Sequence, residues 1–271
     1  MDLEITVQRS LVSKIFAFAY LANFASNYGQ IAGLWGNDGI LPAETLINQS
    51  PLAYLIWIVQ FLSQWFPALL EYSAVDTLLY LVTFIGFSLA LLSICFRFME
   101  NTLTFAVLWM CHYSFFTIGN TFLAFQWDTL LLEVGFLAIF YVKLPFSSGV
   151  FQSHICAREL LRWLLFRFSF GSGIVKLLSN CPTWWSLTAM QYYYETQCLP
   201  SPFSWYFHNL PQEFQKLSVA FTYFALIFAP FLAFVPVRSL RIFLGLVQIT
   251  LQTLIMLTGN YNFFNILCIG L

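Results

Sequence analysis

Five polar side chains occur at helical spacing along, and just before, the apolar stretch from Leu160 to Leu178. On a helix with 3.6 residues per turn they fall within about 40° of one line, so they predict a polar stripe on one side of that helix. They are Arg158, Arg162, Ser169, Ser172 and Lys176. Such a row can pair with acids, hold an anionic headgroup or position a substrate.

Acidic partners for the stripe occur in another apolar stretch, FQWDTLLLEVGFLA. Gln126 and Glu133 share one helical face within about 20°, whereas Asp128 lies roughly 140° from Glu133. Charged groups inside a membrane are costly unless they are paired. We expect these acids to pair with Arg158 or Arg162 across helices and so to fix the helix register. A polar site for a lipid headgroup or small molecule, and a catalytic site, are the alternatives.

The stretch from Asn180 to Phe214, which we name the cap, is the longest part that cannot be a membrane span. Its four prolines break any continuous helix. Its aromatic residues are Trp184, Trp185, Tyr192, Tyr193, Tyr194, Trp205, Tyr206 and Phe207. Trp and Tyr side chains have an apolar ring and a polar group, and they are enriched at bilayer interfaces and binding surfaces. We predict an ordered cap on one membrane face, with His208 as a further candidate for surface recognition.

Membrane helices are the elements that must position these residues. Of the 271 residues, 60% are hydrophobic and only 8% are charged, against about 25% charged in a soluble domain. At about 20 residues a span, the length fits one all-α membrane bundle of about seven to eight spans. Because the chain has no basic patch, we exclude nucleic acid as a partner. No G-x-S-x-G, P-loop or H-E-x-x-H motif and no metal-ligand spacing occurs, so we expect no metal, no cofactor and no assigned catalytic residue.

The predicted spans are Leu11 to Tyr28, Leu78 to Phe96, two within Leu103 to Tyr141 that turn at Gly119-Asn120, Leu160 to Leu178, Leu217 to Val235, Leu240 to Leu257, and one from Asn265. Gly29 to Ser50 is rich in Gly and Pro and predicts a loop. Pro51 to Leu70 is apolar but interrupted by polar residues and proline, which favours a re-entrant or interfacial helix. The last span is cut off at Leu271, so we expect residues 1–271 to be a single transmembrane domain from a longer chain.

Basic residues predict the orientation, because Lys and Arg gather on the cytoplasmic side. With a cytoplasmic N-terminus and Pro51 to Leu70 not crossing, most of the basic residues fall on or near that side. They are Arg9, Arg97, Lys143, Arg158, Arg162, Arg238 and Arg241. The opposite side keeps only Lys176 and Lys216, at span ends. This topology places the Gly29 to Ser50 loop and the cap together on the lumenal side.

A lumenal cap gives two cysteines a possible role. Cys181 and Cys198 would lie in an oxidising compartment, and a bridge between them would close a loop of about 17 residues and stabilise the fold by about 3 kcal/mol. Two free thiols or a redox-active pair are the alternatives. In the other lumenal loop, Asn48-Gln49-Ser50 is an N-glycosylation triplet, although Pro51 follows it directly.

Several longer motifs carry a resemblance over nearly the whole chain. They are Gly33-Leu34-Trp35-Gly36 with Gly39-Ile40-Leu41-Pro42-Ala43, QWDTLLLEVGFLAI, GSGIVKL, CPTWWSLTAM, YETQCLP, KLSV and TGNYNFFN. In content and order the chain resembles the lipase maturation factor family. Where that family commonly has His-Tyr-Glu, this chain has Tyr193-Tyr194-Glu195, so no role passes to a histidine there.

The resemblance implies a polytopic membrane protein of the endoplasmic reticulum that helps secreted lipases or other secretory clients to fold, with no known reaction of its own. It also implies a lumenal loop that contacts clients, for which our candidates are Trp184, Trp185, Tyr194, Glu195, Trp205 and His208. Membrane lipid is the other expected partner. A more distant similarity, to the vitamin K-dependent carboxylase group, implies an alternative: a membrane enzyme or lipid-binding protein that uses the intramembrane arginines, Asp128 and Glu133.

Overall fold

The protein is seen here as a computed structural model that describes residues 2–45, 47, 51–56, 74–144, 153–197, 199 and 201–271. Within these ranges the chain is built of helices and one isolated bridge between Asn101 and Lys143. The predicted all-α class is therefore confirmed. The chain divides into two compact units, Met1–Ala157 and Arg158–Leu271, and the single transmembrane domain stays a prediction.

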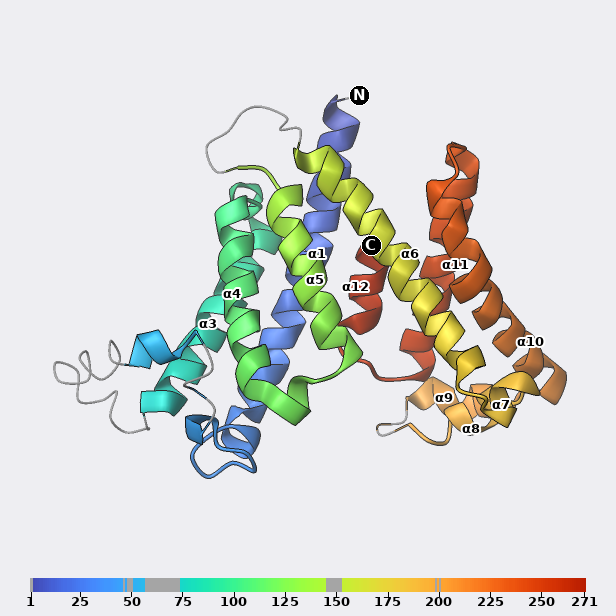
Figure 1. Ribbon diagram of the computed structural model, residues 1–271, viewed down its shortest axis with the longest axis horizontal. Helices are drawn as coiled ribbons and strands as arrows, with labels where there is room; N and C mark the ends of the chain where they lie inside the picture. The colour runs from blue at the N-terminus through green and yellow to red at the C-terminus, as the bar shows by residue number, and fades with distance from the viewer. Residues whose placement is uncertain are drawn as a thin grey trace. The chain divides into compact units, whose positions relative to one another are not determined.

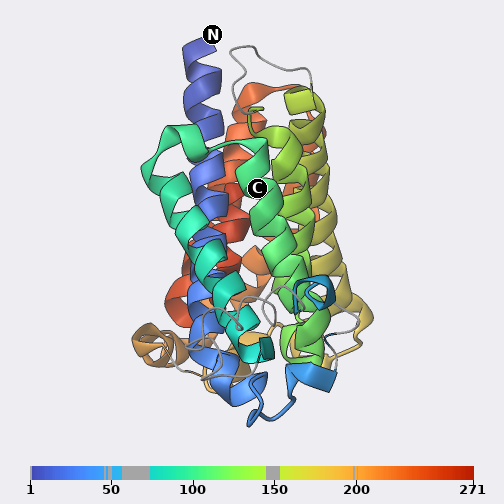
Figure 2. The ribbon, with the colours of Figure 1, turned by 90° about the vertical axis from the view of Figure 1, so that its left-hand side faces the viewer.

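Among its described residues, the first unit is built mainly of the long helices α1, α3, α4 and α5 (Figures 1 and 2). Its elements are α1 (Asp2–Leu34), η1 (Ala43–Thr45), α3 (Ala74–Cys95), η4 (Arg97–Met99), α4 (Thr102–Gly119), η5 (Asn120–Leu123) and α5 (Gln126–Tyr141). Helix α1 packs against α3 and α5, and α4 packs against the same two helices. The buried residues Phe16, Tyr20 and Phe24 of α1 are four positions apart, so they lie on one helical face. That face is tightly covered, since a Cβ added at Gly86 of α3 would lie 2.5 Å from the Phe24 ring.

The turn predicted at Gly119-Asn120 is confirmed. Helix α4 ends at Gly119, and the short helix η5 leads into α5. The loop predicted from Gly29 begins later than expected, because α1 continues to Leu34. Trp35, which follows directly, is buried and its ring lies 5.8 Å from that of Phe115. This packing holds the last turn of α1 in place in spite of its glycines.

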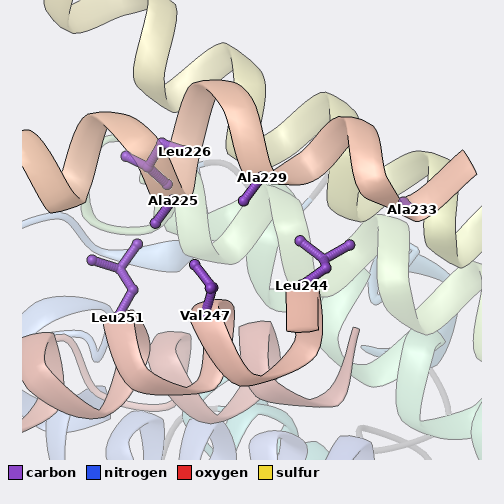
Figure 3. Close-up of a cluster of buried hydrophobic side chains, with 7 residues drawn as sticks. All are labelled: Ala225, Leu226, Ala229, Ala233, Leu244, Val247 and Leu251. Carbon is purple, nitrogen blue, oxygen red and sulfur yellow. The ribbon is translucent and has the colours of Figure 1, made fainter. Parts of the chain in front are cut away.

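The second unit contains most of α6 and all later elements. These are α6 (Ser153–Leu178), α7 (Pro182–Trp185), α8 (Ala189–Tyr193), α9 (Pro202–His208), α10 (Gln212–Tyr223), η6 (Phe224–Phe228), η7 (Ala229–Phe234), α11 (Arg238–Thr258) and α12 (Phe264–Gly270). Its hydrophobic core forms where α11 packs along η6 and η7 (Figure 3). The core residues are Ala225, Leu226, Ala229, Ala233, Leu244, Val247 and Leu251. Small residues on η6 and η7 allow this close approach.

One proline explains the change of helix type after α10. Pro230 has no N–H to donate, and its ring would clash with the carbonyl four residues earlier, so the helix widens into the π turn η6. The N–H of Ala229 then bonds to the carbonyl of Phe224, which leaves the carbonyl of Ala225 without its α-helical partner. Gln248 of α11 replaces that partner, since its Nε2 donates to the Ala225 oxygen at 2.6 Å.

Four described helices are long and apolar enough to cross a membrane. They are Ala74–Cys95, Thr102–Gly119, Gln212–Phe234 and Arg238–Thr258. Each matches a predicted span, so the protein is a helical membrane protein, and the count of seven to eight spans stays a prediction. Most of the segment Pro51 to Leu70, the glycosylation candidate Asn48 and Cys198 lie outside the described residues.

Candidate functional site

The polar stripe lies on one continuous helix, α6, as its spacing predicts. At its start, Arg158 and Arg162 both pair with Glu159, at 3.0 Å and 2.7 Å. Glu159 is on their own helix and was not among the predicted partners. At its end, Lys176 Nζ donates to the Ser172 carbonyl at 2.9 Å. The stripe thus bonds within its own helix at both ends.

The predicted acidic partners have three different environments on α5. Gln126 is exposed, Asp128 is buried with 1% of its surface accessible, and Glu133 is half-buried. The carboxylate atom Oδ2 of Asp128 has no hydrogen-bond partner in the described part of the chain. Pairing of Asp128 or Glu133 with Arg158 or Arg162 stays a prediction.

A buried polar network around His112 escaped the sequence analysis. Its Nδ1 lies 3.1 Å from Asn23 Nδ2, and its Nε2 lies 3.1 Å from the carbonyl oxygen of Asp128. A neutral imidazole satisfies both contacts, accepting from the Asn23 amide and donating to the carbonyl. Since His112 is fully buried, this network joins α1, α4 and α5 inside the first unit. A lone histidine in an apolar stretch gave no spacing signal for it.

The cap consists of three short helices, α7, α8 and α9, which gather beyond the ends of α6 and α10 (Figure 1). Pro182 and Pro202 each occupy the first turn of a helix, where a missing N–H costs nothing. Asn180 and Leu187 have positive φ of 52° and 59° and turn the chain before and after α7. Prolines and left-handed residues therefore divide the described residues of the cap before α10 into short helices of at most seven residues.

Two sets of contacts, which we call anchors, join the cap to the rest of the second unit. Trp184 lies edge-on to Tyr223 with 5.9 Å between ring centroids, and Lys176 Nζ lies 5.2 Å from the centre of the Trp184 ring. At the other anchor, the Ser201 hydroxyl donates to the carbonyl of Leu257, and Gln197 Nε2 donates to the Tyr261 hydroxyl at 3.3 Å. The end of the polar stripe and the TGNYNFFN motif thus both support the cap.

The six client-contact candidates divide into supporting and exposed residues. Tyr194 is buried and packs between the rings of Tyr193 and Phe207. Trp184 is half-buried at its anchor, and the Nδ1 of His208 is buried. Glu195, Trp185 and Trp205 point outward, and the two tryptophans are 62% and 66% exposed. Further exposed aromatic residues on α8 and α9 are Tyr192, Phe203 and Tyr206.

The Sγ of Cys181 lies 3.1 Å from the hydroxyl oxygen of Thr183. This hydrogen bond lowers the pKa of the Cys181 thiol below its ordinary value, because it stabilises the thiolate. Burial raises the pKa of Tyr194, which keeps its hydroxyl neutral. The bridge to Cys198 stays a prediction. No cluster of three or more potential metal ligands occurs among the residues with described positions. The cap therefore carries exposed aromatic side chains and a cysteine whose thiol pKa is lowered by a hydrogen bond.

Comparisons with known proteins agree with the resemblance in the sequence. Residues 7–271 match the family model described as "Lipase maturation factor transmembrane domain". The chain is 45% identical to Lipase maturation factor 2 of Xenopus tropicalis over 93% of its length, and 42% identical to that of Homo sapiens over 96%. It is 30% identical to Lipase maturation factor 1 of Homo sapiens over 95%. The chain spans 36%, 38% and 46% of these relatives' own lengths. No solved structure matches.

Proposed function

Because the chain belongs to the lipase maturation factor family, we propose that it is a membrane factor of the endoplasmic reticulum for the folding and maturation of secreted proteins such as lipases. The names of its relatives support lipases as clients. The helices long enough to cross a membrane support a multi-pass protein. The clients themselves contribute the other half of the interaction, since partly folded proteins expose apolar surface.

The cap is the part that we propose contacts clients, and the observation that carries this is the exposure of Trp185 and Trp205. With exposed Tyr192, Phe203 and Tyr206 they give the cap several exposed aromatic side chains, and contiguous exposed apolar surface marks interaction sites. Trp side chains also lose little conformational entropy on binding, so they suit apolar surfaces of varied shape. The anchors at Trp184 and Ser201 support a preformed surface.

We also propose that the N-terminus is cytoplasmic and that the cap faces the lumen. The distribution of Lys and Arg supports this orientation. Labelling with a membrane-impermeant maleimide tests it. A cysteine at Gln212 should react only from the lumen, and a cysteine at Arg97 only from the cytosol. The reverse pattern would contradict the orientation.

Site-specific photocrosslinking tests the client surface. A photoreactive amino acid replaces Trp205 in cells that secrete a lipase, and the captured lipase is identified after denaturing purification. Phe84 of α3 is the matched control, because it is an aromatic residue with the same 66% exposure on a membrane helix. We expect capture from position 205 and none from position 84. Equal capture from the two positions, or none from either, would contradict the proposal.

One observation favours a second function, a membrane enzyme or lipid-binding protein. Asp128 is a buried carboxylate whose Oδ2 has no hydrogen-bond partner among the described residues, and such groups gather at functional sites. Under this alternative, Asp128→Asn abolishes the secretion of active lipase, while Trp205→Ala leaves that secretion intact. The client-surface proposal expects the opposite order.

A further inference from the structure

A pocket with a mostly basic set of charged residues lies in the first unit. The start of α1, the turn η4 and the residues just after α5 surround it. Its volume is about 150 Å³, roughly ten times what one ordered water needs. Its charged lining residues are Arg9, Arg97, Glu100 and Lys143. Three cations and one anion give the lining a surplus of two positive charges.

The single acid of the pocket is already compensated by its neighbours. Glu100 is buried, and its two carboxylate oxygens accept hydrogen bonds from Ser10 at 2.9 Å and Ser13 at 3.1 Å. Lys14 Nζ lies 3.9 Å from the same carboxylate. Glu100 therefore has little capacity left to neutralise the other cations.

The three cations lack such partners. In the parts of the chain with described positions, no side chain hydrogen-bonds or ion-pairs with Arg9, Arg97 or Lys143. Like charges that converge on one pocket repel each other, and this repulsion is relieved when an anion binds between them. The lining therefore favours an anionic ligand.

The backbone fixes two of the cations in place. The Thr102 N–H donates to the carbonyl of Lys143 at 3.0 Å, and the Thr102 hydroxyl donates to the same oxygen at 3.3 Å. Arg97 begins the single turn η4, which the hydrogen bond from the Glu100 N–H to the Arg97 carbonyl closes at 3.3 Å. The backbone of Arg97 and that of Lys143 are therefore each held by hydrogen bonds at the pocket.

We propose that this pocket binds a phosphate group. Arginine and lysine are the side chains that proteins use for phosphate, as bidentate donors and point charges respectively. Basic pockets between membrane helices bind the headgroups of anionic lipids. Phe96 and Phe98 flank Arg97 and are 49% and 66% exposed, so they offer an apolar surface next to the phosphate site. An anionic lipid and free phosphate share this chemistry, and the test separates them.

Binding is measured by microscale thermophoresis on the full chain in detergent, with three probes. They are dioctanoyl phosphatidic acid, inorganic phosphate and dioctanoyl phosphatidylcholine. We expect phosphatidic acid to bind, and phosphatidylcholine, whose choline cancels the phosphate charge, to bind at least about tenfold more weakly. If inorganic phosphate competes with phosphatidic acid, the phosphate group alone is recognised. If it does not compete, the lipid is the source.

Variants test the residues. Arg97→Gln should weaken phosphatidic acid binding about fivefold, and the triple change with Arg9→Gln and Lys143→Gln should weaken it more than about tenfold. Glu100→Gln should strengthen binding, because it removes the only negative charge from the lining. Arg241→Gln is the matched control, since this arginine bonds to the carbonyl of Val235 in the second unit. Unchanged binding in folded Arg97→Gln and in the triple variant, or equal binding of phosphatidylcholine, would overturn the proposal.

Discussion

The buried network of the first unit and the cap of the second unit use their unusual residues in opposite ways. In the network, Asn23 and His112 are turned inward and bonded to each other and to the backbone of α5. In the cap, Trp185 and Trp205 are turned outward and left in contact with solvent. Burying a polar group inside a membrane protein costs free energy unless the group is hydrogen-bonded. An exposed patch of apolar rings costs free energy unless a partner covers it. The difference supports our proposal that the network stabilises the fold and that the cap contacts clients.

The largest expected effect comes from breaking the network. His112→Leu leaves the Asn23 amide and the Asp128 carbonyl buried without partners, so it should destabilise the protein by about 3 kcal/mol. Unfolding is measured in detergent, with either thermal aggregation or a denaturant titration as the readout of stability. The double variant with Asn23→Leu should recover part of the loss, because it removes one stranded group. A fully tolerated His112→Leu would show that the network is not structural.

Two neighbouring tryptophans sharpen the comparison within the cap. Trp184→Ala removes the contacts with Lys176 and Tyr223 and should loosen the cap by about 2 kcal/mol. Trp185→Ala should leave stability within about 0.5 kcal/mol, because the side chain is exposed. Hydrogen exchange of α7 and α8 measures both. If the two variants lost equal protection from hydrogen exchange, Trp184 could not be distinguished as a supporting residue from Trp185 as a surface residue.

A second matched inward polar group, Gln248, lies in the core of the second unit. Gln248→Leu leaves the carbonyl of Ala225 without a donor and should cost about 1 kcal/mol. Gln252 is a control on the same helix: it is also buried, but its Oε1 accepts no hydrogen bond from any described residue. Thermal unfolding of both leucine variants checks this. A larger loss of stability in Gln252→Leu than in Gln248→Leu would contradict the role of Gln248 as hydrogen-bond donor to the π turn.

The smallest effect concerns the thiol at the edge of the cap. Since the hydrogen bond from Thr183 lowers the pKa of Cys181, iodoacetamide should modify this thiol at a lower pH than an ordinary cysteine. Thr183→Val raises the pKa and moves the alkylation midpoint to higher pH. The profile is recorded in a Cys198→Ser background, where no bridge can compete. An unchanged midpoint in Thr183→Val would contradict the role of the hydroxyl.

The predicted bridge is tested by the same pair of cysteines. If Cys181 and Cys198 are joined, Cys181→Ser and Cys198→Ser have equal effects on stability, and the double variant adds nothing. Additive effects of the two changes would show separate thiols.

The helices of this fold could be predicted from sequence, because long apolar runs indicate helices and Gly-Asn pairs or prolines indicate where they end. The turn at Gly119-Asn120 is one example. The end of α1 could not be predicted, since it depends on Trp35 packing against Phe115, which is distant in sequence.

The candidate site was predictable as a segment but not residue by residue. Helices as short as α7 and α8 have no period long enough to separate inward from outward faces, so buried Tyr194 and exposed Trp185 look alike in the sequence. Arg162 pairs with Glu159 at the local i, i+3 spacing, and Arg158 pairs with the same carboxylate as its direct neighbour in sequence, so both pairs lie within one helix and not across helices.

Secretion of active lipase tests the central claim most directly. The chain replaces the matching region of human Lipase maturation factor 1 in cells that lack the endogenous factor, and secreted lipase activity is normalised to chimera abundance in the membrane. Trp185→Ala and Trp205→Ala should each lower secretion severalfold without lowering abundance, whereas Asp128→Asn and Glu133→Gln should reduce secretion only as far as they reduce abundance. Full secretion by the tryptophan variants, with loss of secretion in Asp128→Asn at normal abundance, would contradict the account and favour a membrane enzyme.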